Sequence, residues 1–140
     1  FQLPASLSVG THTVSVRYEG TDFVAPSGVV SQKLTVAKAK TTTSLTLSKT
    51  TLARGKSETV KIAVGGHSAA DYPSGSVTVT ATVGGKTTTT KVSLPAAKKG
   101  VISFSITLPK VKGTATVTAV YSGNGNFLPS TAARKQVKLT

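Results

Sequence analysis

The chain has 140 residues, a net charge of +13, 38% hydrophobic residues, and no cysteine, methionine or tryptophan. The lack of cysteine excludes disulfide bonds and thiol catalysis, and no apolar run reaches the roughly 18 residues that a membrane-spanning helix requires. This length accommodates one complete domain and part of a second, and the abundance of threonine and serine favours strands with one solvated face.

Residues 1–37 have the pattern of the end of a domain. Their first four residues resemble Phe104 to Pro109, the end of a later strand. Residues 10–18 alternate between apolar and polar, as expected of a half-buried antiparallel strand. Its inward row is His12, Val14, Val16 and Tyr18, and a further strand carries Val30, Leu34 and Val36. We therefore expect residues 1–37 to be the C-terminal strands of a preceding domain, and the natural protein to extend further at its N-terminus.

Residues 38–140 have the pattern of a complete domain with seven short strands and a turn signal between each pair. The strands are expected at 41–48, 58–65, 75–83, 86–94, 100–108, 113–121 and 131–139. Gly84-Gly85 predicts a two-residue hairpin turn between the third and fourth of them. The last two strands are expected to bury Ala115, Val117, Ala119 and Tyr121, and then Ala133, Val137 and Leu139. No useful helical period occurs, so the pattern predicts an all-β fold of two packed antiparallel sheets.

One stretch of the chain occurs twice. The sequence GTATVTAVYSGNGNFLPS, from Gly113 to Ser130, has an altered copy in GTHTVSVRYEGTDFVAPS, from Gly10 to Ser27. The offset between the copies is 103 residues from their first glycine to their Pro-Ser ending. This repetition indicates a segment of a tandem array.

The order of these residues resembles the bacterial immunoglobulin-like repeats, which are tandem modules of large secreted and cell-surface proteins. The residues that carry the resemblance are Leu108-Pro109, Gly113, Val117, Tyr121, Gly123, Phe127 and Pro129-Ser130. The earlier copy has Leu3-Pro4, Gly10, Val14, Tyr18, Gly20, Phe23 and Pro26-Ser27. The resemblance implies an immunoglobulin-like β-sandwich of about seven strands. It also implies a non-catalytic extracellular role, secreted or at the cell surface, as a spacer, stalk or adhesion module whose partners are neighbouring repeats of the same polypeptide.

The residue types offer little for catalysis or for a cofactor. The four acids are scattered over expected loops and strand ends, so we expect no acid–base pair. His12 and His67 are far apart and lack the spacing of metal ligands. Tyr121 ends an inward row, and we expect its ring to be buried and its hydroxyl to bond a loop carbonyl. We expect no enzyme activity, no metal and no cofactor.

The loop after the repeated strand is the candidate contact site, because its charge and composition differ between the copies, whereas the inward row, the tyrosine and the Pro-Ser exit are shared. Its residues are Glu19, Thr21 and Asp22 in the first copy, and Ser122, Asn124, Gly125 and Asn126 in the second. The acidity of the first copy is not repeated, which argues against a calcium site as a general property of the module.

The positive net charge and the unpaired edges expected for the N-terminal strands leave two alternative functions open. The lysines are scattered over polar faces and strand ends, which favours solubility, but the excess of positive charge also favours weak binding of anionic cell-wall polymers or glycans. Specific nucleic-acid binding is not expected, because Tyr18, Tyr121 and Phe104 fall on inward faces. The orphan N-terminal strands expose edges, so a second copy of the chain could complete them and form a strand-swapped oligomer or filament.

Overall fold

The computed structural model describes residues 2–4, 7–66 and 71–140. The chain divides into two compact units, Phe1–Lys38 and Ala39–Thr140. This division falls one residue after the boundary expected at Ala37. No helix in the described part of the chain is long and apolar enough to cross a lipid bilayer.

The first unit is a two-stranded antiparallel ladder of β1 (Gly10–Val16) and β2 (Val30–Val36). His12 and Val14 are half-buried, as the alternation predicts. Val16 and Tyr18, however, are 68% and 47% exposed, so the prediction that they face inward is wrong for this unit. The reason is that, among the described residues, β1 pairs only with β2 and no second sheet covers its apolar face.

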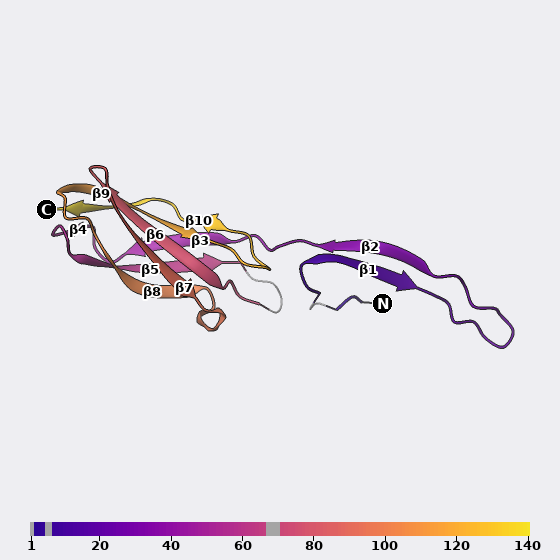
Figure 1. Ribbon diagram of the computed structural model, residues 1–140. Coiled ribbons are helices and arrows are strands. Elements are labelled where there is room, and N and C mark those ends of the chain that lie inside the picture. Colours follow the sequence, from indigo (N-terminus) through magenta and orange to yellow (C-terminus); the bar gives the residue numbers. More distant parts are fainter. Residues whose placement is uncertain (1, 5–6, 67–70) are drawn as a thin grey trace. The chain divides into compact units, whose positions relative to one another are not determined.

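The second unit contains two sheets (Figure 1). The larger has the order β4-β11-β9-β6-β7, with β10 beside β9, and the smaller has the order β3-β5-β8. A 3₁₀ turn, η1 (Ala96–Lys98), precedes β8. The strands are β3 (Thr42–Leu47), β4 (Thr51–Leu52), β5 (Ser57–Gly65), β6 (Gly75–Val83), β7 (Lys86–Leu94), β8 (Val101–Thr107), β9 (Gly113–Tyr121), β10 (Ser130–Thr131) and β11 (Lys135–Leu139).

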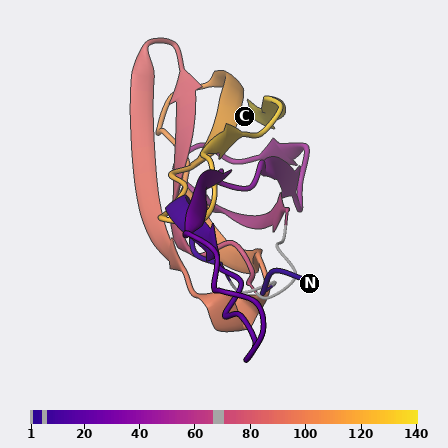
Figure 2. The same ribbon diagram turned by 90° about the vertical axis from the view of Figure 1, so that its right-hand side faces the viewer.

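The two sheets face each other and enclose one core. In Figure 2, β6 and β7 of the larger sheet lie opposite β3 and β5 of the smaller. Alternate residues of each long strand point between the sheets, and the aromatic rings of Tyr121 and Phe127 are fully buried there. The aliphatic core is Leu45, Val60, Ile62, Val64, Val77, Val79, Ala81, Val83, Leu94, Ile102, Ile106, Leu108, Ala115, Val117, Ala119, Ala132, Val137 and Leu139. The prediction of an all-β immunoglobulin-like sandwich is confirmed.

The turn between β6 and β7 also has the predicted form. Val83 pairs with Lys86, which leaves Gly84 and Gly85 as the only two loop residues. Their φ angles are +52° and +74°, a left-handed conformation that side chains with a Cβ adopt at a cost. The two glycines therefore fix the register of the threonine-rich strand β7, which its weak pattern leaves undetermined.

The expected last strand is interrupted. β10 pairs Thr131 with Val120, whereas β11 pairs Lys135 with Val117, so the last segment carries one extra residue between these pairs. Such a bulge shifts the side-chain alternation by one position. Ala132 is consequently the buried residue, and Ala133 is exposed. The prediction that Ala133 faces inward is wrong for this reason.

Candidate functional site

Tyr121 lies where β9 ends and anchors the loop before β6. Its side chain is fully buried, and its hydroxyl donates to the carbonyl oxygen of Ser74 at 2.6 Å. Burial raises the pKa of the phenol; the hydrogen bond to Ser74 acts in the opposite direction, and the negative charge of Asp71 raises the pKa further. The predicted structural role of Tyr121 is confirmed.

The second-copy loop after Tyr121 is held by its own polar side chains. The Asn124 Oδ1 atom accepts the backbone N–H groups of Asn126, at 2.8 Å, and of Phe127, at 2.9 Å. The Asn124 Nδ2 atom donates to the Ser74 carbonyl at 3.1 Å, and Asn126 Nδ2 donates to Asp71 Oδ2 at 3.1 Å. The side chains proposed as a contact site thus make internal hydrogen bonds that shape the loop.

Two further residues of the candidate site are Ser122, which precedes this turn, and Gly125, which lies within it. The Ser122 hydroxyl donates to the carbonyl of Gly123 at 3.1 Å and accepts the backbone N–H of Ser76 at 3.3 Å. Gly125 is exposed at the tip, with open space around the position of a Cβ atom. Ser122, Gly125 and Asn126 are therefore exposed, whereas Asn124 is half-buried.

The first unit contains the same turn with other side chains. Thr21 N–H donates to the carbonyl of Val24 at 2.8 Å, as Asn124 N–H does to Phe127 at 3.0 Å. The Thr21 hydroxyl accepts from Val24 N–H at 3.2 Å, which is the bond that the Asn124 side chain makes in the other copy. The glycine before the turn has φ of +84° at Gly20 and +73° at the second copy's Gly123. The loop frame is therefore shared, although the side chains at its tip differ.

The phenylalanines of the two turns are not equivalent. Phe23 is 98% exposed, whereas Phe127 is fully buried. At the constant offset, the partner of Phe127 is Val24, and Phe23 occupies the tip position of Asn126. The pairing of Phe23 with Phe127 as corresponding residues of the repeat is therefore wrong, because the hydrogen bonds of the turn set the alignment.

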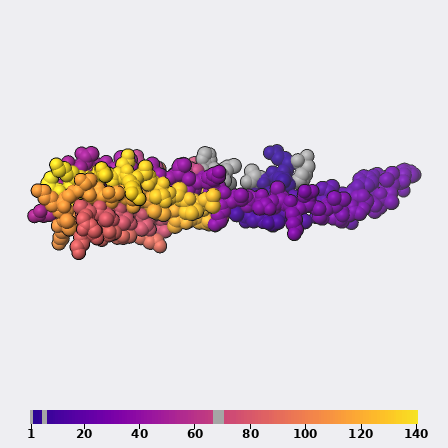
Figure 3. Space-filling model, turned by 90° about the horizontal axis from the view of Figure 1, so that it is seen from above, coloured from indigo at the N-terminus to yellow at the C-terminus, as the bar shows by residue number. Residues whose placement is uncertain are grey.

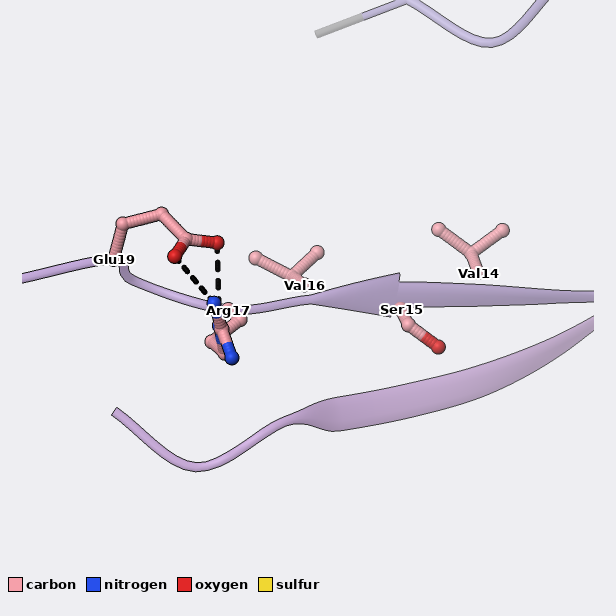
Figure 4. A pocket seen from close by; sticks show the side chains of 5 residues that line it. All are labelled: Val14, Ser15, Val16, Arg17 and Glu19. Atoms are coloured by element: carbon pink, nitrogen blue, oxygen red, sulfur yellow. Dashed lines mark hydrogen bonds and ion pairs between the residues drawn. The ribbon is translucent and has the colours of Figure 1, made fainter. Parts of the chain in front are cut away.

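The acidic side chains of the first loop do not converge. Glu19 forms an ion pair with Arg17, and the remaining acid, Asp22, is exposed in the turn. A shallow hollow beside them is lined by Val14, Ser15, Val16, Arg17 and Glu19 (Figure 4). The valines point to one side of β1, the side whose counterparts in the second unit, Val117 and Ala119, are fully buried. The hollow is therefore the uncovered apolar face of β1.

The histidines and acids bring no metal ligands together. His12 Nε2 donates to the carbonyl of Ser8 at 2.7 Å, and His67 lies outside the described residues. Among residues 2–4, 7–66 and 71–140, no three His, Cys, Asp or Glu side chains are grouped closely enough to hold a metal ion.

Glu58 is a buried polar residue that the sequence interpretation missed. It is 1% exposed and lies near the start of β5, on the same buried face as Val60 and Ile62. Its Oε1 atom accepts the Ser48 hydroxyl at 2.9 Å and the Lys49 N–H at 2.8 Å, while Oε2 has no hydrogen-bond partner. The signal was present in the alternation, because position 58 shares the phase of positions 60, 62 and 64. Glu58 holds the corner where the chain leaves β3.

The family model for bacterial Ig-like domains (group 3) matches residues 45–140. The chain belongs to this family. The resemblance found in the sequence is thereby confirmed, and this Ig-like domain carries the family's sandwich. A comparison with curated protein sequences finds no match.

Comparison with solved structures finds similar chains at low sequence identity. One is a superoxide reductase (neelaredoxin) from Ignicoccus hospitalis, with 15% identity and a TM-score of 0.52 over 74% of this chain and 83% of that one. Another is the CARDB domain of the PF1109 protein from Pyrococcus furiosus, in complex with di-metal ions. It has 16% identity and a TM-score of 0.43 over 76% of this chain and 93% of that one. At 15% identity, the likeness to the superoxide reductase concerns the fold alone.

Proposed function

We propose that this chain is a non-catalytic module of a bacterial surface or secreted protein, where it acts as a spacer, stalk or adhesion repeat in a tandem array. In this proposal, residues 1–37 are the last strands of the preceding repeat and residues 38–140 are a complete one. Bacterial Ig-like domains are usually found on secreted or surface proteins, which supports an extracellular location.

The observation that carries the proposal is the shared register of the two copies. β1 pairs Gly10 with Val36, and β9 pairs Gly113 with Leu139. Adding the offset of 103 to the two residue numbers of the first pair gives the two residue numbers of the second pair. The three pairs that begin at Thr11, His12 and Thr13 follow the same rule. Equal pairing, together with the shared turn, supports one module type used twice.

Burial supports the same assignment. The inward row of β9 is completely buried, because β6 pairs along its other edge and the smaller sheet covers its face. The corresponding residues of β1 are partly exposed, with Val16 at 68%. In a full preceding repeat, a strand equivalent to β6 would pair with this edge, and an opposing sheet would cover the row.

The spacer role is tested by lengthening the array. One, two or three further copies of residues 38–140 are appended after Thr140, and small-angle X-ray scattering measures the maximum dimension. Modules that contact only their neighbours predict an equal increase for every added copy. A maximum dimension that stops growing, as the copies collapse into one globule, would contradict the proposal. Labelling of intact cells of the source bacterium by antibodies against residues 38–140 tests the extracellular location independently.

A second candidate function follows from the exposed strand β1. Among the described residues one edge of β1 has no partner strand, and Val16, Tyr18 and Val30 are exposed. Both features favour completion by another chain, which would give a strand-swapped oligomer or a filament. Multi-angle light scattering on residues 1–140 and on residues 38–140 separates the candidates. Assembly by the longer chain alone would support strand complementation, whereas two monomers would refute it.

A further inference from the structure

The first and last segments of the second unit lie side by side and run in the same direction at two separate places. The N-terminal contact joins residues 39–43 to residues 126–130, and the C-terminal contact joins residues 50–54 to residues 138–140. Both are parallel pairings, in contrast to the antiparallel pairs elsewhere in the unit. The last segment lies at the surface of this unit (yellow in Figure 3).

The backbone of the N-terminal contact is a parallel bridge between Ala39 and Phe127. Ala39 N–H donates to the carbonyl of Asn126 at 2.8 Å, and its carbonyl accepts Leu128 N–H at 2.9 Å. The fully buried ring of Phe127 fixes this part of the last segment in the core.

Hydroxyl groups extend the N-terminal contact inward. The Thr41 hydroxyl donates to the carbonyl of Leu128 at 2.8 Å. The hydroxyl oxygens of Thr41 and Thr43 each lie 2.7 Å from that of Ser130. Ser130 therefore connects two residues of the first segment with one side chain.

The C-terminal contact is the parallel pairing of β4 with β11, in which Lys138 is opposite Thr51 and Leu139 opposite Leu52. Lys138 N–H donates to the Thr50 carbonyl at 2.8 Å, and Thr140 N–H donates to Leu52 at 3.0 Å. The carbonyl of Thr140 in turn accepts Arg54 N–H at 3.2 Å. The residue that ends the unit is thus bonded through both of its backbone groups.

We propose that these two contacts form a shear clamp, which makes the unit resist tension applied between its ends. The proposal rests on the proposed role in an array, where a load enters at Ala39 and leaves at Thr140. The start of β3 and the C-terminus lie at opposite ends of the second unit (Figure 1). Because the paired segments are parallel, the load pulls them past each other along their length. Their hydrogen bonds run across the strands and are strained together, whereas a hairpin pulled apart at its open end loses them one at a time.

Each clamped segment is also anchored on its other side. β3 pairs with β5 from Thr42 to Leu47, and β11 pairs with β9 from Lys135 to Leu139. Between the two contacts, the carboxyl group of Glu58 holds the corner at Ser48 and Lys49. The first segment therefore cannot slide without breaking contacts in both sheets.

Single-molecule pulling in two directions tests the clamp. The chain has no cysteine, so introduced thiols are the only attachment points. Terminal loading uses the full chain with Ala37→Cys and Thr140→Cys. Peeling uses Lys112→Cys and Thr140→Cys, because Gly113 pairs with Leu139 and the β9–β11 ladder then opens from its end. At equal force, we expect unfolding about tenfold or more slower under terminal loading, since several bonds of about 1 kcal/mol each must break together.

A matched pair of serine variants tests the contact itself. Ser130→Ala removes the hydroxyl that joins Thr41 and Thr43, and should accelerate unfolding about tenfold under terminal loading but not under peeling. Ser76→Ala is the control, because it removes a hydroxyl pair with Ser122 that lies outside both contacts.

Equal unfolding rates in the two directions would overturn the proposal, and so would equal effects of the two serine variants under terminal loading. The comparison of terminal loading with peeling leaves the side chains of the N-terminal contact unchanged. It therefore tests the proposal even if the Ser130→Ala chain does not fold. The spacer role is tested separately, by small-angle X-ray scattering on chains with added repeats. If the maximum dimension grows equally with each repeat but the unfolding rates are the same in both pulling directions, the clamp is refuted and the spacer role is not.

Discussion

Replacing Glu58 by alanine tests how the first corner of the sandwich is held. Glu58→Ala removes two hydrogen bonds, at 2.9 and 2.8 Å, together worth about 2–4 kcal/mol. It also removes buried methylene groups worth about 1–2 kcal/mol. The substitution also removes the buried Oε2 atom, which has no hydrogen-bond partner, and this gain offsets about 1–3 kcal/mol of the loss. The expected net loss in the free energy of unfolding is about 2 kcal/mol, and the expected fall in Tm is about 8–16 °C.

Urea unfolding followed by far-ultraviolet circular dichroism measures this loss, with an unchanged m-value as the sign that the unfolded reference is the same. Hydrogen exchange of the Lys49 amide gives a local readout, because Glu58 is its acceptor. Glu58→Gln keeps one acceptor oxygen and should lose less than Glu58→Ala. Lys61→Ala, on the exposed face of the same strand, is the control and should change stability by less than about 0.5 kcal/mol. A Glu58→Ala chain as stable as this control, with unchanged exchange at Lys49, would refute the reasoning.

Three further outcomes are expected. Because burial raises the pKa of Tyr121, the folded chain keeps a proton that the unfolded chain loses above about pH 10; this stability is fully present below that pH and declines above it. Tyr121→Phe should lose about 1 kcal/mol near neutral pH and should flatten the alkaline decline in a urea series measured across pH. Gly123→Ala places a Cβ atom 2.8 Å from the Phe127 carbonyl at a φ of +73° and should cost at least about 1–2 kcal/mol in thermal unfolding, whereas Gly125→Ala, with open space, should be neutral. Binding of a polyanion such as polyglutamate should disappear by about 0.5 M salt in titration calorimetry; binding that persists would indicate a shaped site instead of diffuse attraction.

The strands, the hairpin and the role of Tyr121 could be predicted because local patterns determine them. Alternation over nine residues places Val77, Val79 and Ala81 on one face, and Gly84-Gly85 permits only a tight turn. The repeat offset then identifies the module type. These features need no knowledge of which strands become neighbours.

Features that depend on distant neighbours were missed. The two-residue strand β4 exists because β11 lies beside it, and the bulge before β11 changes which alanine is buried. Tyr18 has the sequence environment of Tyr121, yet it is 47% exposed, because no second sheet covers β1 among the residues that the structure describes. Glu58 follows the inward phase, but an acid in an apolar row contradicts the usual rule of burial and is accepted only because Ser48 and Lys49 supply donors.

The pairing of residues 39–43 with residues 126–130 also determines where this domain should be cut for expression. The sequence match to the family begins at residue 45, after the hydroxyls of Thr41 and Thr43 and the first pairs of β3 with β5. A fragment that starts there leaves Leu128 N–H without its acceptor and exposes part of the edge of β5. Open edges of this kind pair with other chains, so such a fragment should aggregate, and the folding unit to express is the longer one that starts at Ala39.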